Sequence, residues 1–172
     1  MNQIRKWVLA GAALAALAAP AAAADSIKID TSDNCSFTIK LRPDLAPKHV
    51  AQVSKLAAAG FYDGIVFHRV IDGFMAQTGD PTGTGTGGSN EPDLPAEFTK
   101  EHFARGTVGM ARSSDPNSAN SQFFIMFADG GFLDGQYTVF GQVDADGMKC
   151  VDQIERGEPV ANPDKMTKVT VQ

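Results

Sequence analysis

Hydrophobic and polar positions alternate along most of the chain after residue 24, in short runs separated by closely spaced turns. Such runs are typical of β-strands that bury one face. The first two runs, 26–30 and 36–42, flank the tetrapeptide TSDN, and this arrangement predicts a β-hairpin. The remaining runs predict six further strands, at 65–70, 74–77, 107–111, 123–127, 138–143 and 166–171.

Two segments follow the helical period instead. Pro47 opens the first and Gly60 ends it, while the second is predicted over 146–156 and is closed by Gly157. The apolar stripe comprises Val50, Val53, Leu56 and Ala57 in the first helix, and Met148, Val151 and Ile154 in the second. Many strands with only two helices favour an antiparallel barrel or sandwich. The polar stretch 81–95 predicts an ordered surface loop within a single domain.

The first 24 residues have the pattern of a secretory signal peptide. Arg5 and Lys6 precede 12 apolar residues at 8–19, and small alanines stand directly before Asp25. A membrane anchor is the alternative, but a spanning helix needs about 20 apolar residues and this run ends sooner, at Pro20. We therefore expect a signal peptide at 1–24, removed on export, and one domain at 25–172.

Removal of this segment leaves 148 of the 172 residues and changes the formal net charge from −5 to −7. An acidic chain without a cluster of Lys and Arg is a poor candidate for binding nucleic acid or an anionic membrane surface. No later stretch is apolar enough to span a bilayer. We therefore expect an exported domain that binds neither nucleic acid nor a membrane surface.

Cys35 and Cys150 are the two cysteines of the chain. Their even number and the expected oxidising compartment favour a disulfide. Against it, Cys150 lies four residues before Ile154 in a predicted helix, where a free cysteine serves as a small buried apolar residue. The sequence leaves this choice open. Since no Cys-x-x-Cys pair occurs, we do not expect a redox active site.

Several familiar catalytic and cofactor patterns are incomplete in this chain. Gly83, Gly85 and Gly88 match G-x-G-x-x-G, but the prolines that follow exclude the helix that a dinucleotide site requires. The three histidines (His49, His68 and His102) lack metal-ligand spacing, and the serines at 113, 114 and 121 lack a nucleophile elbow. We interpret the glycines as a loop that approaches other backbone closely, and His68 as a hydrogen-bonded core residue.

Alternation over the predicted strand 65–70 places Ile65, Phe67 and Arg69 on one face. An arginine among apolar neighbours usually lays its stem over apolar surface and keeps its charged head in water. A functional role requires Phe74, Met75, Phe124 and Leu133 to meet on the same face. Strand alternation alone does not show this.

The long segments FYDGIVFHRVIDGFMAQTGD, GTVGMARSSDPNSANSQFFI and FLDGQYTVFGQV resemble the cyclophilin family of peptidyl-prolyl cis-trans isomerases. The similarity extends from about residue 26 to residue 171. It implies a mainly β fold, a closed eight-stranded antiparallel β-barrel capped by two α-helices, with an active groove on its outside. It also implies enzymatic rotation of Xaa-Pro peptide bonds without a cofactor or metal.

The resemblance also implies roles for individual residues. Arg69 corresponds to the catalytic residue, and Gln77 to the residue that holds it and contacts substrate. The ring of the substrate proline is expected against Phe74, Met75, Phe124 and Leu133. The groove beside the preceding residue is expected to comprise Ala111, Arg112 and Gln122, where the backbone of Arg112 contacts the preceding carbonyl. A side pocket is expected beside Gly85, Thr86 and Ser113.

Two positions depart from many eukaryotic members, which carry Trp where Phe132 stands and His where Tyr137 stands. Because Phe132 lacks the ring N–H that helps to bind the immunosuppressant cyclosporin, we expect weak cyclosporin binding. Tyr137 keeps an aromatic wall with a polar tip. We expect a monomeric periplasmic isomerase that acts on proline-containing unfolded or folding polypeptides. The alternative is a proline-peptide binding module or chaperone whose catalysis is incidental.

Overall fold

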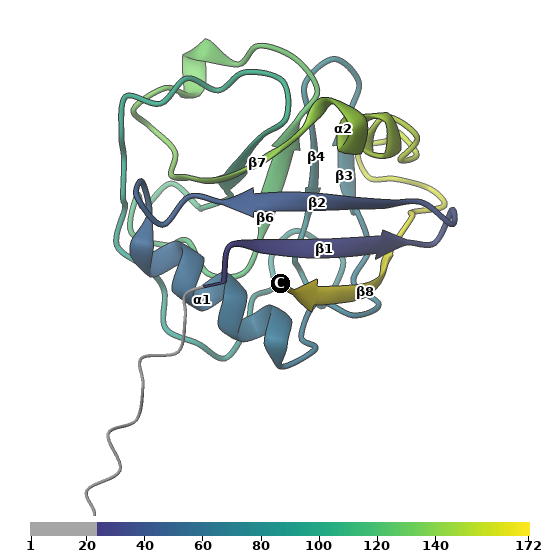
Figure 1. The fold of residues 1–172 in the computed structure, drawn as a ribbon, viewed down its shortest axis with the longest axis horizontal. Coiled ribbons are helices and arrows are strands. Elements are labelled where there is room, and N and C mark those ends of the chain that lie inside the picture. The colour runs from purple at the N-terminus through teal and green to yellow at the C-terminus, as the bar shows by residue number, and fades with distance from the viewer. Residues whose placement is uncertain (1–23) are drawn as a thin grey trace, which may run out of the picture.

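The computed structural model describes residues 24–172, and the predicted signal peptide lies outside the described residues except for Ala24. Eight antiparallel strands form one curled sheet in the order β3-β4-β6-β5-β7-β2-β1-β8. The strands are β1 (Ser26–Thr31), β2 (Ser36–Leu41), β3 (Arg69–Ile71), β4 (Met75–Thr78), β5 (Thr107–Met110), β6 (Phe123–Met126), β7 (Val139–Val143) and β8 (Met166–Val171). Figure 1 shows β1, β2 and β8 running across the view, whereas β3, β4 and β6 run upright.

Two α-helices and one short 3-10 helix accompany the sheet. Helix α1 (Pro47–Ala58) packs against β8, and α2 (Ala145–Val151) packs against β2. The two helices lie at opposite sides of the sheet in Figure 1. The 3-10 helix η1 (Gly131–Leu133) precedes β7. Within residues 24–172, none of the helices has the length and apolar character needed to cross a membrane.

The concave side of the sheet and the two α-helices enclose the main hydrophobic core, which we call the inner core. Its members include Phe123 and Phe140, whose rings meet edge to face at 5.9 Å between centroids. The apolar stripes predicted for both helices are buried in it, down to Ile154 beyond the end of α2. The predicted mainly β fold with two α-helices is therefore confirmed.

The predicted closed barrel is wrong, because β3 and β8 lie at the two open edges of the sheet and share no ladder. One isolated bridge, Val66 to Lys165, joins the segments that precede these strands. The Val66 carbonyl accepts a hydrogen bond from the Thr78 hydroxyl at 2.9 Å instead of from a neighbouring strand. The predicted strand 65–70 is accordingly reduced to β3, which begins only at Arg69.

Helix α2 is also shorter than the predicted segment 146–156. Asp144 caps its beginning by accepting a hydrogen bond from the backbone N–H of Gly147 at 2.7 Å. Beyond Val151 the chain tightens into a turn, in which the N–H of Ile154 bonds to the Val151 carbonyl. The N–H of Glu155 then donates to the Asp164 carboxylate, so side-chain bonding replaces the helical pattern.

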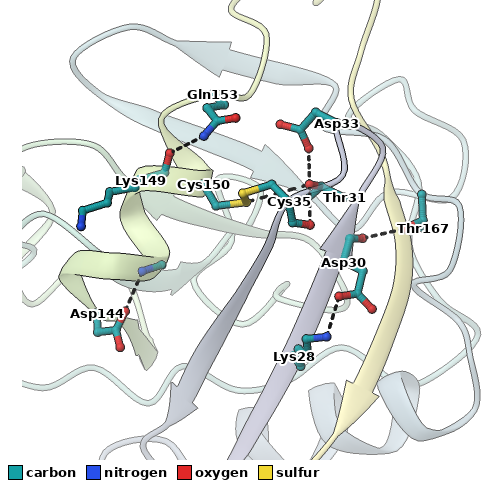
Figure 2. Close-up of a disulfide and its surroundings, with 11 residues drawn as sticks. Lys28, Asp30, Thr31, Asp33, Cys35, Asp144, Lys149, Cys150, Gln153 and Thr167 are labelled. Carbon is teal, nitrogen blue, oxygen red and sulfur yellow. Dashed lines mark hydrogen bonds and ion pairs between the residues drawn. A yellow bond between two sulfur atoms is a disulfide. The ribbon is translucent and has the colours of Figure 1, made fainter.

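Cys35 and Cys150 form a disulfide that joins the β1–β2 turn to α2, across a sequence separation of 115 residues. Figure 2 shows the bridge beside Thr31, whose hydroxyl donates to the Cys35 carbonyl at 3.0 Å. The Cα atoms of the two cysteines are 5.8 Å apart, a normal separation for a disulfide. The choice that the sequence left open is therefore settled in favour of the bridge.

Replacing both Cys35 and Cys150 with alanine should lower the free energy of unfolding by about 2–4 kcal/mol, because the bridge closes a long loop in the unfolded chain. Denaturant titration of the variant and of the oxidised native protein measures the difference. A thiol reductant should shift the midpoint of the native protein towards that of the variant and leave the variant unchanged. Equal midpoints for the oxidised protein and the variant would contradict a stabilising role.

Candidate active site

The outer face of β4 and β6 carries a second hydrophobic group, separate from the inner core. Along β6, Phe123 and Ile125 point into the inner core, whereas Phe124 and Met126 point outward. Met75 on β4 faces outward beside Met126, its partner in the ladder. We call this group the outer cluster: Met75, Phe103, Phe124, Met126, Leu133 and Val139. The alternation of two strands thus gives the sheet an apolar surface on its outside.

A pocket opens on the outer cluster. Its lining residues are Arg69, Phe74, Met75, Gln77, Ala111, Arg112, Phe124, Leu133 and Tyr137. The base is close-packed, since the rings of Phe103 and Phe124 stack at 5.8 Å between centroids. Gly109 lies beneath them, where an added Cβ would approach both rings to 2.6 Å. A glycine is therefore required at this position to let the two rings pack against β5.

Arg69 reaches the edge of this pocket through strand pairing. It lies directly opposite Gln77 in the β3–β4 ladder. Its Nε donates to Glu158 Oε1 at 2.5 Å, and its Nη1 donates to Gln77 Oε1 at 3.4 Å. Its side chain is 38% exposed. The guanidinium is consequently held from two sides and still faces solvent at the mouth of the pocket.

The predicted face for Arg69 is wrong. Ile65 and Phe67 are buried in the inner core, whereas Arg69 is half-buried on the outer side with Ile71. Alternation fails because residues 65–68 are not a regular strand, and Phe67 and His68 are both buried in succession. Arg69 therefore lies on the same side of the sheet as Met75 and Phe124, and on the side opposite to Ile65 and Phe67.

A chain of amide hydrogen bonds continues from Arg69. Gln77 Nε2 donates to Gln122 Oε1 at 2.9 Å. Gln122 Nε2 in turn donates to the carbonyls of Gly85 and Gly87, at 3.1 and 2.8 Å. Each amide uses its oxygen towards Arg69 and its nitrogen towards the loop, so the orientation of Gln77 depends on the position of the glycine-rich loop.

Asp80 fixes that loop from within. Its buried carboxylate accepts hydrogen bonds from the backbone N–H groups of Thr82, Thr84, Gly85 and Gly87 at 2.6–3.1 Å. Burial raises the pKa of this carboxyl, but the hydrogen bonds outweigh burial and hold it at about 2. The glycines of the G-x-G-x-x-G pattern thus belong to a loop wrapped around a carboxylate.

A second groove adjoins the pocket and shares Gln77, Ala111 and Arg112 with it. Its other lining residues are Gly85, Thr86, Gly87, Gly88, Ser89, Asp93, Ser113, Ser118, Asn120 and Gln122. The predicted side pocket beside Gly85, Thr86 and Ser113 falls within this groove. Polar or charged side chains make up most of the groove lining, whereas the pocket lining combines apolar side chains with Arg69, Gln77, Arg112 and Tyr137.

The structure brings nine of the eleven predicted site residues into the one pocket. Gln122 lines the neighbouring groove instead. Phe132 stands at the rim, 65% exposed, with its ring centroid 5.5 Å from that of Phe74. Sequence reasoning missed Glu158, which pairs with Arg69 across 89 positions. No pattern in the sequence links residues so far apart.

The histidines lie outside the pocket lining. His68 is buried, but neither ring nitrogen has a hydrogen-bond partner, so the predicted hydrogen-bonded histidine is wrong. Burial lowers the pKa of His68. His49 is buried with its Nδ1 2.6 Å from Glu97 Oε2. Among residues 24–172, no group of three His, Cys, Asp or Glu side chains could hold a metal ion.

The pocket offers apolar contact and hydrogen-bond donors. Its lining includes no serine, cysteine, histidine or carboxylate, and its polar members are Arg69, Gln77, Arg112 and Tyr137. Such a site can bind a compact apolar group and present a positively charged donor to it. These properties suit a reaction in which a hydrogen bond donated by the pocket becomes stronger in the transition state. Such a reaction needs no covalent intermediate.

Comparison with known proteins gives the same family throughout. A family model described as cyclophilin type peptidyl-prolyl cis-trans isomerase/CLD matches residues 26–172. A Brucella suis protein named probable peptidyl-prolyl cis-trans isomerase is 61% identical over 150 residues, 78% of this chain and 76% of its own length. An Aspergillus oryzae protein named peptidyl-prolyl cis-trans isomerase-like 1 is 41% identical over 137 residues, 76% of this chain and 82% of its own.

Solved structures agree with these relatives. The cyclophilin AquaCyp293 from Hirschia baltica superimposes with a TM-score of 0.76 at 28% identity, covering 85% of this chain and 73% of its own. A Cryptosporidium parvum cyclophilin type peptidyl-prolyl cis-trans isomerase, crystallised in the presence of the dipeptide Ala-Pro, superimposes with a TM-score of 0.77 at 27% identity. This match covers 86% of this chain and 98% of the Cryptosporidium chain. The chain belongs to the cyclophilin-type peptidyl-prolyl cis-trans isomerase family.

Proposed function

We propose that the chain isomerises Xaa-Pro peptide bonds of exported proteins, with Arg69 as the catalytic residue. The observation that carries this proposal is the position of the Arg69 guanidinium, held by Gln77 and Glu158 at the mouth of an apolar pocket. The pocket takes the proline ring, and the dipeptide Ala-Pro present with the Cryptosporidium relative supports a proline-containing substrate.

The barrier to be lowered is loss of amide resonance. Rotation of an Xaa-Pro bond crosses about 18–20 kcal/mol and takes tens to hundreds of seconds unaided. Acceleration to milliseconds requires a factor of about 10⁵, or roughly 7 kcal/mol. No bond breaks, so neither a nucleophile nor a proton store is required.

Arg69 supplies part of this energy by binding the twisted state more strongly than the planar one. In the planar amide the nitrogen lone pair is delocalised, whereas in the twisted amide it can accept a hydrogen bond. A donor aimed at that nitrogen therefore stabilises the transition state selectively. A guanidinium keeps its charge at physiological pH, and such a hydrogen bond contributes about 2–3 kcal/mol.

The apolar lining lowers the remaining part of the barrier by positioning the substrate proline. Met75, Phe124 and Leu133 are almost fully buried and hold one side of the pocket in place. A proline ring clamped against them stays fixed while the preceding carbonyl swings, which lowers the entropic cost of reaching the twisted geometry. Removal of water around Arg69 by the bound peptide further strengthens its hydrogen bond.

Export to the periplasm and action as a monomer complete the proposal. The charged, apolar and small-residue order of segment 1–24 supports export. The disulfide between Cys35 and Cys150 supports an oxidising compartment, since such bonds are rare in reducing ones. Assistance to folding follows from the slow isomerisation of proline bonds in newly exported chains.

Replacing Arg69 with alanine should lower kcat/KM on an Xaa-Pro peptide by about 30- to 150-fold, the equivalent of 2–3 kcal/mol. Peptide affinity should change by less than about threefold, because the apolar lining remains. Exchange spectroscopy on the isomerising peptide gives the rate, and calorimetry gives the affinity. Arg105→Ala is the matched control, since Arg105 also pairs with a carboxylate, that of Asp152, but lies outside the pocket.

Equal losses of rate and affinity in Arg69→Ala would contradict a selective role in the transition state. Retention of the native rate would show that Arg69 has no catalytic part. A native protein that binds the peptide but does not accelerate its isomerisation would identify the chain as a proline-peptide binder. Thermal unfolding of the variant and the control separates either outcome from a folding defect.

Cyclosporin should inhibit this protein weakly. The ring at position 132 is phenylalanine, which has no N–H to donate to the drug, while its exposed face still borders the pocket. The Phe132→Trp variant should bind cyclosporin at least tenfold more tightly, with peptide isomerisation retained. Titration of the isomerase rate with cyclosporin gives the inhibition constant of the native protein and that of the variant. Nanomolar inhibition of the native protein would refute this prediction.

A further inference from the structure

Two arginines line the pocket, and they differ in how their charge is balanced. Arg69 has a carboxylate partner in Glu158 at 2.5 Å. Arg112 has no carboxylate within 4.0 Å anywhere in residues 24–172, and its hydrogen bonds go to neutral carbonyl groups. The pocket therefore carries one balanced positive charge and one unbalanced positive charge.

The unbalanced charge is held in a defined place. Arg112 Nε and Nη2 donate to the Gln136 carbonyl at 3.2 and 3.0 Å, and Nη1 donates to the Ser113 carbonyl at 2.8 Å. Its guanidinium carbon lies 4.4 Å from the centroid of the Tyr137 ring and 6.0 Å from that of Phe98. Three of the five N–H groups are used, which leaves two for a ligand. An ordered cation loses little entropy when it binds an anion.

Arg112 also stands where the substrate chain must pass. It lines both the apolar pocket and the neighbouring polar groove, together with Gln77 and Ala111. With the proline ring in the pocket and its nitrogen at Arg69, the preceding residue lies at this junction. This placement rests on the proposed function.

We propose that Arg112 is a specificity-determining residue that favours Xaa-Pro bonds in which Xaa is Asp or Glu. The side chain of Xaa meets the unbalanced guanidinium, while Arg69 is already paired and gives no such preference. Of the residues that line the two cavities, Asp93 alone carries a negative charge. Asp93 accepts a hydrogen bond from Asn120 at 2.9 Å and lines only the groove, not the pocket proposed to take the proline ring.

The size of the preference follows from the partial exposure of the pair. Ion pairs near a protein surface contribute modestly, so we expect kcat/KM to be about two- to fivefold higher for Glu-Pro than for Gln-Pro. Since salt screens exposed charges, the ratio should fall towards one as ionic strength rises to about 1 M.

The test compares end-blocked Ala-Glu-Pro-Phe and Ala-Gln-Pro-Phe, which have nearly the same shape and differ by one charge. Exchange rates are measured at neutral pH and low salt after subtraction of the uncatalysed rates. Within each protein variant only the ratio of the two peptides is used, so that a general loss of activity cancels. Arg112→Gln should bring the ratio to about one, and Arg112→Lys should keep part of it.

Arg112→Glu should invert the preference and lower the ratio below one. Lys40→Gln is the matched control, because it removes the same charge from an exposed position on β2 outside both cavities. Its ratio should equal that of the native protein. Salt titration of the native ratio tests the electrostatic origin.

Equal rates on the two peptides in the native protein would overturn the inference and leave the proposed isomerase function intact. A ratio that survives in Arg112→Gln would also overturn it, because the preference would then arise elsewhere. If neither peptide is isomerised above the uncatalysed rate, the proposed function itself fails and the inference fails with it.

Discussion

The catalytic arrangement depends on the register of three neighbouring strands. Arg69 on β3 lies opposite Gln77 on β4, and Gln77 lies opposite Phe124 on β6. One row across the outside of the sheet therefore holds the cationic donor, the amide that orients it and a wall of the apolar pocket. A shift of one residue in either ladder would turn some of these side chains into the inner core.

The polar part of the site is fixed at one end by the buried Asp80 carboxylate. It gathers the backbone N–H groups of the glycine-rich loop, and the carbonyls of that loop hold Gln122. Gln122 then orients Gln77, which contacts Arg69. Because strands set the position of the guanidinium and amides set its direction, the site is ordered before any peptide binds, as electrostatic catalysis requires.

Local pattern predicted most of the elements, since alternation and helical period depend on residues near one another. It failed where distant segments decide the geometry. The Val66 carbonyl accepts a hydrogen bond from Thr78, the Phe67 N–H donates to the Asp164 carbonyl, and β3 begins only at Arg69. Arg69 consequently lies on the side of the sheet opposite to Phe67. Glu158 reaches Arg69 from 89 positions away, and no local signal marks it. The pocket residues came from family resemblance, because only the folded sheet brings β4, β6 and η1 together.

The most direct test of this account is a double-mutant cycle on Arg69 and Gln122, read as kcat on a single Xaa-Pro peptide. Gln122→Ala should lower kcat by about fivefold in the native protein, the worth of one positioning hydrogen bond. In the Arg69→Ala background the same change should lower kcat by less than about twofold, because no guanidinium remains to be oriented. Equal factors in both backgrounds would show that Gln122 acts independently of Arg69 and would contradict the account.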